Sequence, residues 1–222
     1  SHASTDQTRP ILTCLKLHGP LLVATDSYRL IAAPVGGVIG TPETLLPAAT
    51  MSSALAGAKT GEVTIELEDR YGKLARISRD GETWTMLTFD AQFPNWNQLF
   101  PDSFPCEVTF DRAPMLLAAA SAKRTLVKNT PVRLRIDEHT LHLSGHVPDG
   151  ASISSSVNGI TTVGSMNGDG AQEIGCNPEF LHGALSSLQG GRLTLKLISP
   201  TRPMLLTDGT TKVLLMPIRL NV

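Results

Sequence analysis

Cysteine is scarce in this sequence, and its placement excludes two ways of stabilising a small domain. The three cysteines, Cys14, Cys106 and Cys176, lie far apart and form no Cys-x-x-Cys motif. An odd count without short spacing argues against a disulfide framework and against a zinc site, and it is typical of a reducing compartment. We therefore expect a cytoplasmic protein that needs neither a metal nor a cofactor.

Long apolar runs, aromatic residues and an excess of either charge are also missing. The longest apolar stretches, such as 116–120, fall far short of the ~20 residues that span a bilayer, and the polar start is unlike a signal peptide. Aromatic residues make up 5% of the chain, so the core must consist of aliphatic side chains and methionine. The 19 Lys and Arg nearly balance the 20 Asp and Glu, which excludes a strong attraction to nucleic acid through net charge.

Catalytic motifs are absent as well. The sequence has no Gly-x-Ser-x-Gly, Gly-x-Gly-x-x-Gly or P-loop motif. His139, His142 and His146 are the best metal candidates, but no carboxylate or thiol stands at ligand spacing, and surface histidines on a hairpin are the better interpretation. The acids that stand out form no pair placed for acid–base chemistry: they are Asp26, Asp137 and Glu138. The sequence therefore argues against an enzyme.

An internal repeat favours two small domains over one large one within the 222 residues. Segment 51–67 matches 181–197 without a gap, at an offset of 130 (181 − 51). Each copy has apolar residues at helical spacing, then glycine, then the alternation of a strand. In the second copy Asn177-Pro178-Glu179 is a helix start, and Gly190-Gly191 predicts a left-handed helix end.

Two earlier segments, 12–26 and 132–144, each predict a strand, a turn and a strand. Aligning Leu17 with Ile136 gives an offset of 119 (136 − 17), which leaves an insertion of about eleven residues in the second copy. We place the insertion in the stretch 145–170, where Gly, Ser and Asn predict a loop.

The second copy opens with elements that the first copy lacks. It has a strand at Glu107–Phe110 and a helix over about residues 112–127. In the first copy, the equivalents of this strand and of most of this helix would precede Ser1. We therefore expect the first domain to be a fragment that begins inside its own first helix. The start itself, without an initiator Met, is typical of an internal cut or of a cloning remnant.

The order of elements predicts an α+β fold in each copy. Helices would pack on one face of an antiparallel β-sheet, with two-residue turns such as Asp208-Gly209 between short strands. Proline interrupts both helices and ladders, so the stretch Phe100–Pro105 indicates a seam. The expected domains are residues 1–105 and 106–222.

Three short motifs resemble one known family. They are Ala24–Leu30 (ATDSYRL), Phe93–Pro101 (FPNWNQLFP) and Leu214–Leu220 (LLMPIRL). Together with 173–181 and 199–203, they resemble the β sliding clamp of bacterial DNA polymerase III, along its second and third domains. The resemblance implies two tandem DNA-clamp-like domains, and a processivity factor without catalytic residues. In that family a ring of subunits encircles double-stranded DNA without reading its sequence.

The resemblance also implies a peptide-binding pocket between the two domains. There the polymerase catalytic subunit, the clamp loader and repair proteins would dock through short peptides that contain Leu and Phe. Apolar walls and an adaptable methionine that bury two side chains predict roughly micromolar affinity. Gln98 stands where many members have a basic residue, which weakens any ion pair there. Position by position, the pocket residues are Leu12, Thr25, Ser27, Tyr28, Arg29, Leu30, Pro94, Gln98, Leu99, Pro203, Leu214, Met216, Pro217, Ile218, Arg219 and Leu220.

Basic side chains are the candidates for DNA contact. The resemblance places Lys123, Arg124 and Lys128 on the helix that faces the central hole, and Arg9 at the end of the truncated helix of the first domain. Arg124 and Lys128 are four residues apart and would share a helix face. Such cations would contact phosphates without reading bases. A solvated helix face is the alternative interpretation.

Other interpretations of the whole chain stay open. As a fragment, the chain would have lost the self-association that forms the ring. It could instead be a stand-alone two-domain clamp-like module, of which three copies would supply the domains of a trimeric ring. A peptide-binding decoy and an unrelated α+β enzyme are the remaining alternatives.

Overall fold

The computed structural model describes residues 2–37, 42–56, 63–68, 74–137, 140–147, 150–163 and 172–220. The chain divides into two compact units, Ser1–Trp96 and Asn97–Val222, called here the N-terminal and C-terminal units. Residues 97–105, which the sequence assigns to the first domain, belong to the C-terminal unit. In the described part of the chain, no helix is long and apolar enough to cross a membrane.

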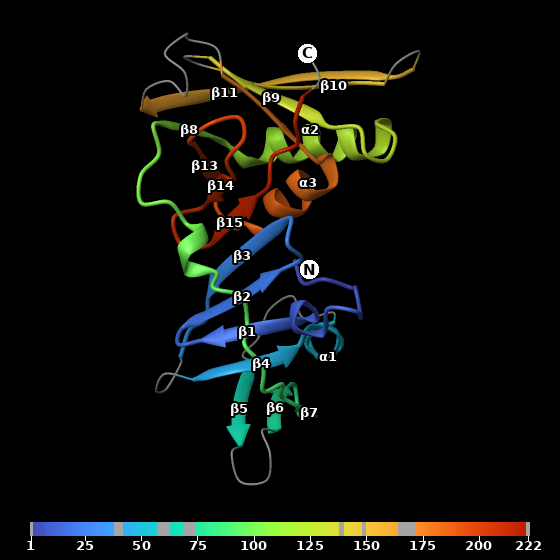
Figure 1. Cartoon of the computed structure of the whole chain (residues 1–222), viewed down its shortest axis with the longest axis vertical. Coiled ribbons are helices and arrows are strands. Elements are labelled where there is room, and N and C mark those ends of the chain that lie inside the picture. Colours follow the sequence, from blue (N-terminus) through green and yellow to red (C-terminus); the bar gives the residue numbers. More distant parts are fainter. Residues whose placement is uncertain are drawn as a thin grey trace. The chain divides into compact units, whose positions relative to one another are not determined.

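The N-terminal unit contains two antiparallel sheets around a short helix (Figure 1). One sheet has the order β3-β2-β1-β4 and the other β5-β6-β7. The core lies between the sheets and α1, and its buried members are Leu17, Leu46, Met51, Ala54, Ala75, Ile77 and Met86. The elements are the 3-10 helix η1 Pro10–Thr13, β1 Cys14–His18, β2 Leu21–Thr25, β3 Arg29–Pro34, β4 Glu43–Pro47, α1 Ala48–Ala54, β5 Thr64–Glu68, β6 Leu74–Arg79 and β7 Glu82–Leu87.

The C-terminal unit contains one antiparallel sheet of order β12-β9-β10-β11-β8-β13-β14-β15. Helices α2 and α3 pack together on the face of β9, β10 and β11 that carries the buried leucines (Figure 1). The elements are the 3-10 helix η2 Asn97–Leu99, β8 Cys106–Asp111, α2 Arg112–Thr125, β9 Val132–Ile136, β10 Thr140–His146, β11 Ser152–Val163, β12 Gln172–Cys176, α3 Pro178–Ser187, β13 Arg192–Leu197, β14 Met204–Thr207 and β15 Lys212–Leu215.

The sheet order confirms the repeat. Strands β4-β1-β2-β3 follow the same order as β12-β9-β10-β11, and β5-β6-β7 the same order as β13-β14-β15. In the C-terminal unit β8 pairs with both β11 and β13 and so joins the two sets of strands. Among the described residues of the N-terminal unit, no strand takes the place of β8. The predicted α+β fold with helices on one face of an antiparallel sheet is therefore confirmed.

The repeat extends to the segment after the last strand of each unit. The amide of Phe89 donates to the carbonyl oxygen of Leu45 at 3.0 Å, and the amide of Ile218 donates to that of Gly175 at 2.8 Å. Leu45 and Gly175 are equivalent at the offset of 130 (175 − 45). In both units the chain thus returns to the equivalent strand, β4 in the N-terminal unit and β12 in the C-terminal unit.

The pairing of strands corrects the earlier alignment. Lys16 lies opposite Leu45, and Arg133 lies opposite Gly175. The equivalent of Lys16 is therefore Arg133, an offset of 117 (133 − 16) in place of the predicted 119. The shift is two residues, and it keeps every side chain on its face because strands alternate with a period of two.

Part of the stretch predicted as a loop over 145–170 is a strand, and residues 148–149 and 164–170 lie outside the described residues. Strand β11 covers Ser152–Val163 and pairs with β10 and β8. Its first half alternates between more buried residues, such as Ile153 and Val157, and exposed serines and asparagine. The small polar residues hid a period of two that is typical of a half-buried strand.

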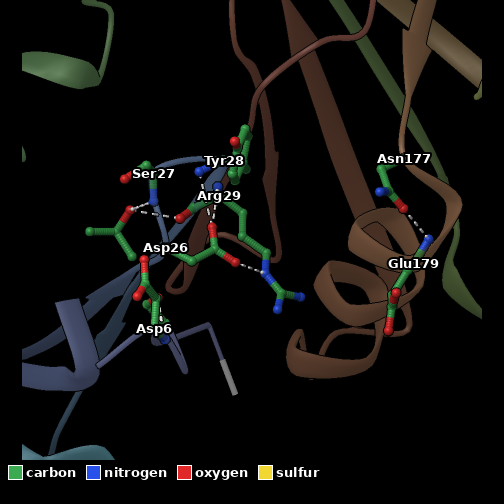
Figure 2. A network of polar contacts seen from close by, with 9 residues as sticks. Asp6, Asp26, Ser27, Tyr28, Arg29, Asn177 and Glu179 are labelled. Carbon is green, nitrogen blue, oxygen red and sulfur yellow. Dashed lines mark hydrogen bonds and ion pairs between the residues drawn. The ribbon is translucent and has the colours of Figure 1, made fainter. Parts of the chain in front are cut away.

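The helix starts agree with the sequence, whereas the helix ends differ. Helix α3 begins at Pro178, and the Asn177 side chain accepts a hydrogen bond from the Glu179 amide at 2.8 Å (Figure 2). It ends because Leu188 is extended, with ψ 143°, and no left-handed glycine closes it. Gly190 instead allows the backbone of Arg192 to come close, since a Cβ at position 190 would lie 2.8 Å from the Arg192 carbonyl oxygen.

The hairpin between β14 and β15 also has a longer turn than predicted. Thr207 pairs with Lys212, which leaves four residues, 208–211, in the turn. The Asp208 carboxylate accepts hydrogen bonds from the amides of Thr210 at 3.0 Å and Thr211 at 2.8 Å, and Gly209 has φ +99°. The turn is therefore held by the aspartate rather than by a tight two-residue geometry.

Candidate partner-binding site

The turn between β2 and β3 is held by one carboxylate (Figure 2). Asp26 Oδ1 accepts hydrogen bonds from the amides of Tyr28 and Arg29, both at 3.0 Å. Its other oxygen forms an ion pair with Arg29 Nε at 2.9 Å, and both side chains are largely buried. Charge-assisted hydrogen bonds of this kind fix a turn more firmly than neutral ones do.

A strained residue lies at the centre of this turn. Ser27 has φ 79°, a left-handed conformation that costs about 1–3 kcal/mol for a residue other than glycine. Thr25 Oγ1 accepts a hydrogen bond from the Ser27 amide at 3.2 Å and donates to the Arg29 carbonyl oxygen at 2.8 Å. Arg9 Nη1 donates to Ser27 Oγ at 3.1 Å. The strain is thus compensated, and Tyr28 stands at a fixed tip with 59% of its surface exposed.

Three of the leucines predicted to line the pocket behave differently from Tyr28. Leu12, Leu30 and Leu214 are all buried, with Leu30 3% exposed. They belong to η1, β3 and β15 and support the fold from inside. Within the N-terminal unit, the accessible predicted residues are therefore the turn residues Ser27 and Tyr28, together with Pro94.

In the C-terminal unit the predicted residues follow the last strand. Met216 is 45% exposed, directly after β15. Pro203 comes directly before Met204, which pairs with Leu215, so Pro203 and Met216 lie at the same end of the hairpin. Gln98 and Leu99 are on η2, and Leu99 is 51% exposed. Leu99 and Met216 are thus accessible apolar side chains.

The segment Pro217–Leu220 is held in place by Gly175, a residue that the sequence analysis did not include in the site. The Ile218 amide donates to the Gly175 carbonyl oxygen at 2.8 Å. A Cβ on Gly175 would lie 2.4 Å from the Ile218 carbonyl oxygen and 2.8 Å from Leu220 Cδ2. Only glycine allows this approach. The repeat offered a signal for this residue, because the second copy has a glycine at the position where the first copy has Leu45.

The residues predicted to contact DNA fall in two different settings. Lys123 and Arg124 are exposed in the last turn of α2, where cations complement the helix dipole. Lys123 Nζ lies 3.8 Å from Glu179 Oε1. The prediction that Lys128 shares a helix face with Arg124 is wrong, because α2 ends at Thr125 and Leu126 is extended, with ψ 141°.

Arg9 also differs from its predicted place. It precedes the 3-10 helix η1 rather than ending a helix. Its guanidinium forms an ion pair with Asp6 at 2.9 Å and a hydrogen bond with Ser27. These contacts give Arg9 a role in supporting the Tyr28 turn.

Groups that could bind a metal ion do not gather in the described residues. No cluster of three or more His, Cys, Asp and Glu is found there. His142 forms hydrogen bonds with Asp137 at 2.8 Å and Ser156 at 2.9 Å, while His139 lies outside the described residues. Burial raises the pKa of the Cys176 thiol to about 12, so this thiol stays protonated and unreactive near neutral pH.

Comparison with known proteins shows which family the chain resembles. Residues 97–219 match the family described as DNA polymerase III beta subunit, C-terminal domain. The chain is 26% identical over 242 residues to the beta sliding clamp of Streptomyces coelicolor, covering 99% of this chain and 62% of that protein. It is 30% identical over 235 residues to the beta sliding clamp of Synechococcus elongatus, covering 98% of this chain and 60% of that protein.

Solved structures share the fold. The DNA polymerase sliding clamp of Bacillus subtilis matches with a TM-score of 0.84 at 19% identity, over 99% of this chain and 60% of that chain. The sliding clamp of Bartonella birtlesii bound to griselimycin matches with a TM-score of 0.80 at 24% identity, over 99% of this chain and 61% of that chain. The chain thus spans about 60% of the length of these relatives. Because the family match covers more than half of its 222 residues, the chain belongs to the DNA polymerase III beta subunit family.

Proposed function

We propose that this chain is the partner-binding part of a bacterial DNA sliding clamp. It would act in the cytoplasm as a non-catalytic processivity factor. The polymerase catalytic subunit, the clamp loader and repair proteins would dock on it through short peptides that contain Leu and Phe. Family membership supports this role, and the relatives named above are sliding clamps.

The observation that carries the proposal is the pair of apolar side chains held in accessible positions. Tyr28 stands on a turn fixed by Asp26, and Met216 precedes a segment fixed on Gly175. Tyrosine offers a large rigid surface, and methionine adapts to different ligands. Each apolar side chain that a peptide buries contributes about 1.5–3 kcal/mol, which after ordering costs gives roughly micromolar affinity. Such affinity suits partners that exchange.

A peptide titration tests this function. We expect a peptide ending in Leu-Phe to bind, and Tyr28→Ala and Met216→Ala each to weaken binding about tenfold, through loss of buried area. Truncating Leu30 would be a poor test, because that side chain is buried in β3 and its loss acts through folding. Leu87→Ala and Leu117→Ala are matched controls, since both leucines are exposed and outside the predicted site. Absence of binding up to millimolar peptide, or equal losses in the controls, would contradict the proposal.

We further propose that the whole protein encircles double-stranded DNA in a ring formed by self-association. Lys123 and Arg124 would contact phosphates, and the nearly balanced charge of the chain would keep such contacts weak enough for sliding. For the chain itself, replacing both cations with glutamine should lower the slope of log affinity against log salt by about 2. Arg202→Gln, an exposed cation elsewhere in the same unit, serves as the control. A slope that the double replacement leaves unchanged would show that Lys123 and Arg124 do not contact DNA phosphates.

A further inference from the structure

A groove of about 760 Å³ lies on the C-terminal unit. Strands β9, β10 and β11 contribute Arg133, His146 and Ser152 to its lining, and segment 218–220 contributes another part of its wall. The groove is therefore built partly from the core sheet and partly from the segment that Gly175 fixes.

The strand register explains why these groups meet. Arg133 lies opposite both Gly175 on β12 and Ser144 on β10, and His146 lies opposite Ser152 on β11. The neighbours in sequence, Leu134 and Leu143, are buried against the helices. Because side chains alternate along a strand, Arg133 and Ser144 face away from the helices. Segment 218–220 crosses the sheet on this same face, since it lies where a Cβ on Gly175 would project.

The chemistry of the groove favours an anion. Arg133, His146 and Arg219 line it together with the hydroxyls of Ser144 and Ser152, and none of the described residues that line it is acidic. Arg133 already forms an ion pair with Glu173 at 2.6 Å, but its side chain stays 41% exposed. A guanidinium carries five N–H donors, so one carboxylate does not exhaust it. Ile153, Ile218 and Leu220 add apolar surface.

We propose that this groove binds the acidic residues that flank the Leu-Phe motif of a partner peptide. The proposal rests on the proposed function, because Ile218, Arg219 and Leu220 belong both to the predicted peptide site and to the groove lining. The peptide motif supplies most of the affinity, and the acidic flank supplies selectivity and faster association. Exposed ion pairs have this effect, and salt weakens it.

Extended peptides test the proposal on the intact chain. The parent peptide ends in Leu-Phe. Each test peptide adds to it three residues of one kind, aspartate, serine or lysine, at either the amino or the carboxyl end. We expect one aspartate extension to bind about fivefold more tightly than the matching serine extension at low salt. This advantage should vanish at about 0.5 M salt, where the Debye length falls below ~5 Å.

A variant that adds a negative charge to the groove locates the effect. Ser152→Asp places a carboxylate beside His146 and should abolish the aspartate advantage while leaving the affinity for the serine-extended peptides unchanged. Ser186→Asp adds the same charge on an exposed position of α3 and should leave the advantage intact. Equal binding of aspartate and serine peptides, or an advantage that survives Ser152→Asp, would overturn the groove assignment and leave the peptide site standing. Failure of every peptide to bind would overturn both.

Discussion

The two units share one strand order but differ in a single connecting strand. In the C-terminal unit β8 pairs with β11 and β13, so that eight strands form one sheet. In the N-terminal unit the described strands form two separate sheets, and the smaller sheet has only β6 paired on both sides. Leu67, Leu87 and Phe89, which lie in or just after this smaller sheet, are large exposed apolar residues. The eight-stranded sheet therefore depends on β8, whose place no described strand takes in the N-terminal unit.

The units also differ at the point where the chain returns to its first sheet. Leu45 and Gly175 are equivalent and accept the same backbone hydrogen bond, from Phe89 and Ile218 respectively. Leu45 carries a buried side chain at this position, with 1% of its surface exposed. Gly175 leaves that space to segment 218–220. The same architecture thus yields a structural contact in one unit and a wall of a candidate binding site in the other.

The largest expected effect comes from equivalent leucines in the two repeats. Leu55 and Leu185 match at the offset of 130, but Leu185 is fully buried in α3 whereas Leu55 is half-buried. We expect Leu185→Ala to lower the free energy of unfolding by about 2–5 kcal/mol and Leu55→Ala by about 1 kcal/mol, because a cavity forms only in the tighter core. Urea denaturation, with hydrogen exchange to assign each transition to a unit, measures both. Equal losses would show that the cores are equally tight.

The second prediction concerns the glycine that distinguishes the units. Gly175→Ala should destabilise the chain by about 1–3 kcal/mol and weaken binding of a Leu-Phe peptide about tenfold, because the new methyl group displaces segment 218–220. Gly191→Ala is the matched control: a Cβ there meets no atom within 4 Å, and its change in stability should stay within about 0.5 kcal/mol. Thermal unfolding and calorimetric titration measure the two effects. Unaltered peptide binding by the Gly175 variant would contradict this account.

The smallest expected effect compares the aspartates that hold turns in the two units. Partial burial acts to raise the pKa of Asp208, but hydrogen bonds from the amides of Gln189, Thr211 and Thr210 outweigh it and lower the pKa to about 2. The carboxylate therefore stabilises the fold fully above its unfolded pKa of 3.8, and this contribution is lost as pH falls towards 2. After allowance for solvent screening, it amounts to about 1–2 kcal/mol.

Replacing Asp208 with asparagine should reduce the dependence of the melting temperature on pH between about pH 4 and pH 2. Asp26→Asn in the other hairpin keeps an acceptor oxygen for both amides but removes the ion pair with Arg29, and should lower stability at neutral pH by about 1 kcal/mol. Asp102→Asn, at an exposed position, is the control for both. An Asp208 variant that keeps the acid dependence of the parent would assign that dependence to other carboxyls.

Much of the fold follows from local pattern. The helical spacing of 181, 184, 185 and 188 and the Asn-Pro-Glu start correctly predicted α3, and the gapless repeat anticipated the shared strand order. The predicted pocket residues were harder to interpret. Leu30 and Leu214 are buried in strands while Tyr28 and Met216 are exposed, and a hydrophobic residue type alone does not tell core from surface. Strand β11 was missed because serine and asparagine carry little β propensity.

The sequence by itself determined the repeat, the helix start at Asn177 and the membership of a family, because these depend on residues close together in the chain or on ordered motifs. Only the tertiary structure decided that Ile218 pairs with Gly175, 43 residues earlier (218 − 175), and that Arg133, His146 and Arg219 line one groove. Such contacts arise from strand register, because residues far apart in the sequence become neighbours when their strands pair. The physical reason is that local pattern fixes which way a side chain faces, whereas packing fixes what it faces.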